Sequence, residues 1–235
     1  ENMSVFISHV HWDHWHGPSL KRFFKKNPIY TPKAFNSRSL NDLKSIGLSK
    51  VSEIASGDVV VIGDIRVTFF SFGLYLEDAA IVIETPDIKI LNVNDCKILD
   101  WPLDKILKKY GPFDFVLRSH SSANVRACCE INGIASLDDR EHYYRSFKLF
   151  MDVVKPKYAV PFASNHCHLS EDTLHFNSYI SDPIELGRWL EDKSRKWTYQ
   201  PMLPGDSWSS SDGFAIHDTL AFHDKESYIA EYRLL

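Results

Sequence analysis

The chain has 235 residues, 44% of them hydrophobic, a size that allows one large domain or two small ones. Its formal net charge of −4 supplies no basic field for a nucleic-acid backbone, so we expect no nucleic-acid partner. No apolar run reaches the roughly 18 residues that a membrane-spanning helix needs, so we expect no membrane partner either.

The predicted elements alternate between strands and helices along the whole chain. The pairs Gly63-Asp64 and Pro86-Asp87 mark turns between strands, and Ser37 is placed as the N-cap of a helix that Gly47 closes. In chain order we expect a strand at 4–8, helices from Pro18 and at 37–46, a hairpin at 59–70, paired strands at 79–83 and 89–93, a helix at 102–109, a strand at 113–117, a helix at 137–154, a strand at 158–162, a helix at 183–190 and a last helix at 222–233. This order favours an αββα two-sheet sandwich flanked by helices, of the α/β class. Because no linker is visible, residues 1–235 are expected to form a single domain.

The chemistry-bearing residues cluster directly after the first predicted strand. The run His9-Val10-His11-Trp12-Asp13-His14 places three imidazoles and a carboxylate within six residues. Alternation along an extended chain aims His9 and His11 the same way, and the following turn brings in Asp13 and His14. Nitrogen and oxygen ligands at this density suit Zn²⁺ or Fe²⁺ rather than Ca²⁺ or Mg²⁺. The other interpretation is a surface histidine tract.

The H-x-H-x-D-H string resembles the first ligand motif of the metallo-β-lactamase superfamily. That resemblance implies that His9 and His11 bind one metal ion and that Asp13 and His14 bind a second. It also implies a later bridging aspartate, which Asp95 matches at the end of the strand that runs into Asp95-Cys96. The alternative for Asp95 is a turn or cap residue. Asp13 and Asp95 are therefore the candidate catalytic residues.

Within the superfamily, several short blocks resemble the metallo-β-lactamase-like part of the CMP-N-acetylneuraminate hydroxylase family. They occur in the family's order, from about Val5 to Gly205, and comprise 89–96, 158–163, 182–186 and 204–205. Members of the superfamily carry further strands before the first motif, whereas eight residues precede His9 here. We therefore expect an N-terminal segment or another chain to complete the sheet.

The third motif of the superfamily departs from its usual form in this chain. It should supply a histidine upstream of the bridging aspartate, but the sequence holds no histidine between His16 and His120. Either the first site lacks that ligand, or Glu77 or Asp78 replaces it; an ordinary loop carboxylate is the other interpretation. His9, His11 and Asp95 then form a two-histidine, one-carboxylate set, as in non-haem Fe(II) oxygen chemistry, although three ligands also satisfy zinc.

The last family motif should place one histidine after a late strand. His166 and His168 both follow the predicted strand at 158–162, and alternation allows one of them to face a metal. We prefer His166. His120, just beyond another strand, is interpreted as a loop residue or a hydrogen-bond donor behind a ligand.

The leading functional hypothesis is an iron-dependent oxygenase or hydroxylase that acts on a polar, phosphorylated or sugar-like small molecule and holds one or two ions. Zinc-dependent hydrolysis of a phosphoester, lactone or amide is the alternative, and a non-catalytic binding module is a third. The four cysteines form neither a disulfide framework nor the paired motifs of a Rieske centre, so the setting is expected to be reducing and cytoplasmic. Electrons would then come from a separate transfer partner.

Overall fold

The computed structural model describes residues 3–11, 13–73, 78–121, 140–163, 167–178 and 180–234. The chain divides into two compact units, residues 1–116 and residues 117–235. Folding of both units as the single expected domain stays a prediction. Within the described ranges, no helix is long and apolar enough to cross a membrane.

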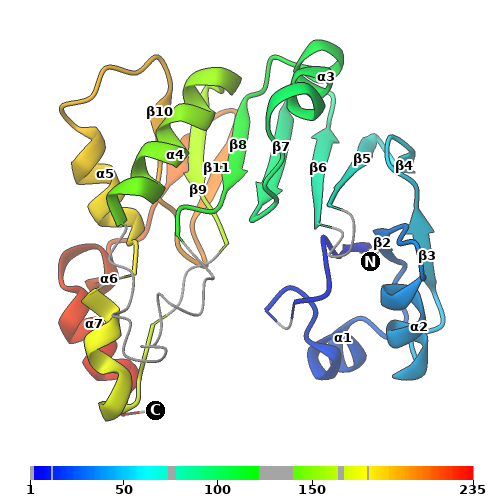
Figure 1. Cartoon of the computed structure of the whole chain (residues 1–235), viewed down its shortest axis with the longest axis horizontal. Coiled ribbons are helices and arrows are strands. Elements are labelled where there is room, and N and C mark those ends of the chain that lie inside the picture. The colour runs from blue at the N-terminus through cyan, green and yellow to red at the C-terminus, as the bar shows by residue number, and fades with distance from the viewer. Residues whose placement is uncertain are drawn as a thin grey trace. The chain divides into compact units, whose positions relative to one another are not determined.

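The unit of residues 1–116 contains two kinds of sheet in its described part (Figure 1). A parallel sheet has the strand order β1-β2-β3, and an antiparallel run has the order β4-β5-β6-β7. The elements are β1 (Val5–Phe6), α1 (Gly17–Phe23), β2 (Ile29–Pro32), α2 (Arg38–Ser45), β3 (Val51–Ile54), β4 (Val59–Ile62), β5 (Ile65–Phe72), β6 (Asp78–Glu84), β7 (Lys89–Asn94) and α3 (Asp100–Tyr110).

Helices α1 and α2 cover one face of the parallel sheet. Ile29 of β2 packs there with Leu20 of α1 and Leu43 of α2, and all three side chains are buried. Burial of each such side chain contributes roughly 1.5–3 kcal/mol. Because side chains alternate along a strand, the next residue, Tyr30, points to the opposite face.

The opposite face of the parallel sheet packs on the antiparallel strands. The rings of Phe6 and Tyr30 stack with centroids 5.1 Å apart, and Phe6 also lies 5.6 Å from Phe69 of β5. Phe69 is fully buried in a cluster with Val67 and Ile81. The two sheets therefore form the central layers of this unit.

Helix α3 covers the outer face of the antiparallel strands. Phe70, which alternates with Phe69 along β5, has its ring 5.4 Å from that of Tyr110 in α3. Lys89 Nζ also donates a hydrogen bond of 3.2 Å to the Tyr110 carbonyl. Helix, sheet, sheet and helix thus follow one another, which is the αββα order expected from the sequence.

Residues 117–235 form the second unit. Strand β8 enters it from the first unit and lies next to β9, which pairs in parallel with β10. Its other elements are mainly helical. The elements are β8 (Phe115–Arg118), α4 (Arg140–Val154), β9 (Tyr158–Pro161), the 3₁₀ helix η2 (Glu171–Ser178), α5 (Pro183–Leu190), β10 (Thr198–Tyr199), β11 (Ser207–Ser209), β12 (Gly213–Ala215), α6 (Leu220–His223) and α7 (Lys225–Tyr232).

Ser37 is the N-cap residue of α2 and a helix lies in the expected C-terminal range, but two details differ from the prediction. Ser37 precedes α2 but adopts a φ of 48° and makes no cap bond; its hydroxyl donates to Glu53 Oε2 instead, at 2.9 Å. The last helix is interrupted, because Asp224 leaves helical geometry and its carboxylate caps α7 by accepting from the Ser227 N–H. The expected start of α4 at 137–139 lies outside the described residues.

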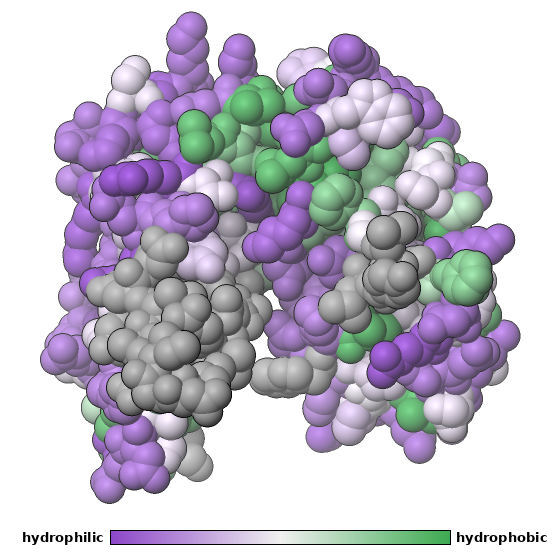
Figure 2. All heavy atoms as spheres, in the orientation of Figure 1, coloured by the Kyte–Doolittle hydropathy of each residue, from purple (hydrophilic) through white to green (hydrophobic). Residues whose placement is uncertain are grey.

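Figure 2 shows the hydropathy of one face of the molecule. Hydrophilic side chains dominate this face, and apolar ones gather in its upper central part. Within β6 and β7, the side chains of Ala80, Val82 and Leu91 are fully buried. The strands that end beside the candidate site are therefore held by a well-packed core.

Candidate metal centre

Two chain turns in the first unit bring the candidate ligands together. After β1, the N–H groups of His14 and Trp15 both donate to the His11 carbonyl, at 3.0 and 2.7 Å, so the chain folds back at His11. The indole of Trp15 packs under this turn against Gly17 and Ile46. The turn expected from the sequence is therefore present, with Trp15 in a packing role.

The second turn ends β7 at Asn94. This residue has a φ of 43°, a conformation that asparagine tolerates better than most residues. Its amide donates to the Ala79 carbonyl at 3.0 Å, and its Oδ1 accepts from the Asp95 N–H at 2.8 Å. Asn94 thereby ties the end of β7 to the start of β6 and fixes the direction in which Asp95 leaves the strand.

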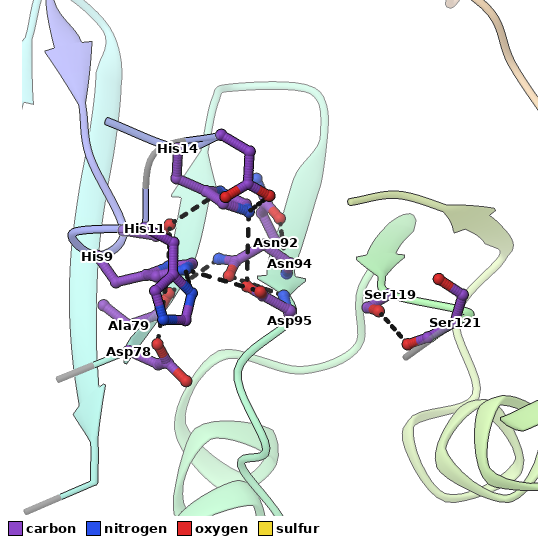
Figure 3. Close-up of polar contacts among 12 residues, drawn as sticks. His9, His11, His14, Asp78, Ala79, Asn92, Asn94, Asp95, Ser119 and Ser121 are labelled. Carbon is purple, nitrogen blue, oxygen red and sulfur yellow. Dashed lines mark hydrogen bonds and ion pairs between the residues drawn. The ribbon is translucent and has the colours of Figure 1, made fainter. Parts of the chain in front are cut away.

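His9, His11 and Asp95 form the core of the site (Figure 3). His9 Nε2 lies 2.9 Å from His11 Nδ1 and 3.6 Å from Asp95 Oδ2. One ligand atom from each of the three residues lies within 4.8 Å of the others. Zinc and iron hold such atoms about 2.0–2.2 Å from the ion, so these separations fit a shared ion.

His14 and Asp13 also lie beside Asp95, and the His14 ring has its centroid 4.3 Å from that of His9. His14 Nε2 is 3.8 Å from Asp95 Oδ1 and 3.4 Å from Asp13 Oδ2. The two oxygens of Asp95 thus face different histidines, His9 and His14, as a carboxylate between two ions would. Asp95 Oδ1 is buried and makes no hydrogen bond within the described residues.

Burial sets the protonation of His9. Its side chain is 3% exposed, and this burial, assisted by nearby His14 and His11, lowers its pKa to about 4 against the opposing charges of Asp95 and Asp13. His9 is therefore neutral at pH 7, which is the form that binds a metal ion. Burial, and then the charge of Asp95, raise the pKa of Asp78.

Two further potential ligands, Cys96 and His16, are close to the cluster in sequence but do not belong to it. Cys96 follows Asp95, but its buried thiol, whose pKa burial raises to about 12, is not among the side chains whose ligand atoms cluster here. His16 is exposed and bonds Ser19 Oγ at 2.7 Å through its Nδ1. The chemistry of the site is thus that of imidazoles and carboxylates.

The remaining candidates belong to the second unit or lie outside the described residues. His166, Glu77 and Trp12 lie outside them. The backbone of His168 is paired on both sides with the Asn177 amide, at 2.7 and 2.9 Å. His120 is 2% exposed, and its carbonyl accepts from Ser181 Oγ at 2.6 Å.

Sequence reasoning missed two residues that support the ligands. Ser8 Oγ lies 3.0 Å from His9 Nδ1 and 3.5 Å from His14 Nδ1, so one hydroxyl contacts both rings. Asn94 was noted only as one residue of the block 89–96 that contains Asp95. A polar residue just before or after a ligand is a weak signal, although Asn at a strand end is a recognisable turn former.

No protein-family model and no curated protein matches the chain. Solved structures do. CmlA, a diiron beta-hydroxylase from Streptomyces venezuelae, matches with a TM-score of 0.58 and 17% identity over 85% of this chain and 43% of its own. A possible metal-dependent hydrolase from Veillonella parvula matches at 0.60 and 12%, over 86% and 74%. YhfI of Bacillus subtilis, described as a metallo-beta-lactamase fold protein, matches at 0.51 and 12%, over 84% and 73%.

The chain has the metallo-β-lactamase fold. This agrees with the αββα layers of residues 1–116 and with the position of the histidine cluster after β1. The chain spans less than half the length of CmlA, 43%. At sequence identities of 12–17%, the similarity to these structures shows a shared fold only.

Proposed function

We propose that this chain is the metal-binding part of an enzyme, in which His9, His11 and Asp95 hold one divalent ion and Asp95, Asp13 and His14 hold a second. The Asp95 carboxylate carries the proposal. Its Oδ2 lies 3.6 Å from His9 Nε2, while its buried Oδ1 has no hydrogen-bond partner within the described residues. A buried carboxylate oxygen without a partner is costly, and a cation removes that cost. His166 remains the proposed additional ligand of the second ion.

The leading proposed activity is iron-dependent hydroxylation of a polar small molecule. Two histidines and one carboxylate with open positions are the donor set of non-haem Fe(II) oxygenases. The likeness to CmlA, and the short blocks that resemble CMP-N-acetylneuraminate hydroxylases, are the reasons for preferring this activity. Bound iron would supply the redox chemistry with oxygen.

The residues of the chain would orient the ion and control its access. His9 is buried and neutral, so it anchors the ion from the protein side, whereas His11 is exposed and marks the solvent side. The side chain of Asp13 is 46% exposed, and its Oδ2 lies 3.4 Å from His14 Nε2. Substrate would therefore approach along the side of His11 and Asp13.

The proposed oxygenase needs an external source of electrons. Of the four cysteines, Cys96 is a buried neutral thiol and Cys167 is exposed, while Cys128 and Cys129 lie outside the described residues. None belongs to the paired Cys and His motifs that hold a Rieske cluster. We therefore propose a separate electron-transfer region or protein.

Zinc-dependent hydrolysis is the second candidate. His9, His11 and Asp95 supply the three protein ligands that a catalytic zinc site uses with a water in the fourth position. The likeness to the possible metal-dependent hydrolase of Veillonella parvula favours it. Its substrate would be a phosphoester, lactone or amide.

Metal content of matched variants tests the shared part of both proposals. His9→Ala removes the buried ligand, while His142→Ala removes an exposed histidine on α4 in the second unit. We expect His9→Ala to lose at least one ion per chain by elemental analysis and His142→Ala to keep the wild-type content. Equal content in both variants, or a wild type without metal, would contradict the proposal.

A further inference from the structure

Asp78 lies beside the candidate centre although it is outside the group of atoms that fits an ion. It is the first residue of β6, and its side chain is 22% exposed. Its Oδ1 is 3.7 Å from His9 Nδ1 and is buried without a hydrogen-bond partner in the described residues. The carboxylate is therefore directed at the ring of one candidate ligand.

The two nitrogens of His9 face different surroundings (Figure 3). Nε2 faces His11 Nδ1 and Asp95 Oδ2, at 2.9 and 3.6 Å. Nδ1 faces Ser8 Oγ and Asp78 Oδ1, at 3.0 and 3.7 Å. One nitrogen thus points to the proposed ion, and the other points to a hydroxyl and a carboxylate.

A neutral imidazole carries its proton on one nitrogen and its lone pair on the other. A carboxylate near Nδ1 favours the proton there, which leaves the lone pair on Nε2. It also makes the ring a more basic ligand. At 3.7 Å the influence of Asp78 is electrostatic rather than a direct hydrogen bond, and Ser8 supplies the nearer contact.

We infer that Asp78 is a positioning residue that holds His9 in the Nδ1–H tautomer with Nε2 turned to the ion. The inference rests on the proposed function, since it needs an ion at His9, His11 and Asp95. It also gives a role to the unusual third motif. In place of a histidine that binds the ion directly, this chain has a carboxylate that acts through His9.

The location of Asp78 follows from contacts that the backbone fixes. Asp78 pairs with Phe72 at the end of the β5–β6 ladder, and the neighbouring Ala79 carbonyl accepts from the Asn94 amide. The same Asn94 directs Asp95. One asparagine therefore sets the positions of both carboxylates, one for each nitrogen of His9.

Cobalt(II) binding tests the inference without requiring turnover. Co²⁺ reports both its affinity and the geometry of its ligands through its visible absorption. We expect Asp78→Asn to weaken Co²⁺ binding by about 10- to 100-fold and to shift the absorption bands, the usual effect of removing a residue that supports a ligand. Asp87→Asn, an exposed carboxylate in the β6–β7 turn, should match the wild type in both measurements.

Two further variants make the outcome decisive. Asp78→Glu keeps a negative charge on the Nδ1 side and should recover most of the lost affinity, whereas His9→Ala should abolish binding at this site. Wild-type affinity and spectrum in Asp78→Asn would overturn the inference, and so would an Asp78→Glu variant as weak as Asp78→Asn. Complete loss in Asp78→Asn, equal to that in His9→Ala, would identify Asp78 as a ligand and also overturn it. A wild type that binds no Co²⁺ would instead overturn the proposed function.

Discussion

Asp95 Oδ2 lies 3.6 Å from His9 Nε2, although one residue follows β7 and the other follows β1. The first strand of one sheet and the last antiparallel strand of the other thus end at the same place. The proposed chemistry depends on this meeting point, since neither segment alone provides both imidazole and bridging carboxylate.

Replacement of Asp95 tests its proposed place between two ions. Asp95→Asn preserves shape but removes the charge and places an NH₂ donor where an oxygen faced the ion. We expect loss of at least one bound metal and of activity, with an unchanged circular dichroism spectrum, because β7 itself is intact. An Asn variant with full metal content and turnover would make Asp95 a structural cap.

The two proposed ion sites should differ in occupancy. The proposed site of Asp13, His14, Asp95 and His166 would have all the ligand types that the resemblance implies, whereas the proposed site of His9 and His11 has no third-motif histidine in the sequence. Elemental analysis of wild type, His14→Ala and His9→Ala would measure each site separately. Full and equal zinc occupancy of both sites in the wild type would refute the difference.

Much of this centre follows from the sequence because its residues are local. The spacing of His9, His11 and His14 around one turn predicts their convergence, and Asp95 at a strand end predicts a carboxylate at a sheet edge. The hairpins β4–β5 and β6–β7 also follow from their turn residues. These features depend on short-range chain geometry.

Features that depend on tertiary contacts were not predictable. The Ser37 hydroxyl donates to Glu53 in β3 rather than bonding to the first turn of its own helix. Strand β3 itself is recognised only by its pairing with β2. The third motif shows the same limit. The sequence offered Asp78 as a ligand or a loop carboxylate, and the positioning role that we infer rests on its distance to His9 Nδ1, which sequence spacing does not reveal.

Acid should destabilise the metal-free protein through His9. Burial lowers the pKa of folded His9 to about 4, whereas an unfolded histidine titrates near 6.5. Between pH 4 and about pH 6.5 the unfolded state binds more protons at this histidine than the folded state does. The stability that neutral His9 contributes is therefore complete above about pH 6.5 and is lost as the pH falls toward 4. Asp78, whose pKa is raised in the folded state, favours stability at low pH instead. The pH dependence of the wild type is therefore compared with that of a His9 variant, so that the part due to His9 can be separated.

Urea unfolding at pH 7 and pH 4.5 measures this effect. We expect His9→Gln to reduce the pH-dependent loss of unfolding free energy by about 1–3 kcal/mol. His142→Gln, on the exposed side of α4, should leave the loss unchanged. The same loss in wild type and His9→Gln would show that His9 titrates normally.

The N-cap of α5 should contribute measurably to stability. Asp182 accepts hydrogen bonds from the N–H groups of Ile184 and Glu185 at 2.7 and 3.1 Å and lies 3.5 Å from Lys225 Nζ. We expect Asp182→Ala to lower the free energy of unfolding by about 1 kcal/mol. Asp192→Ala is the control, because Asp192 is an exposed carboxylate just after the same helix, and it should change the free energy of unfolding little. Equal stability of the two variants would be inconsistent with a stabilising cap at Asp182.

Iron content combined with oxygen uptake tests the central claim most directly. The chain would be purified with and without oxygen, its iron and zinc measured, and oxygen consumption followed with a chemical reductant and polar phosphorylated or sugar-like compounds. We expect iron in the anaerobic sample and substrate-dependent oxygen uptake that Asp95→Asn abolishes. Zinc in both samples, no oxygen uptake and hydrolysis of an ester or lactone would contradict it.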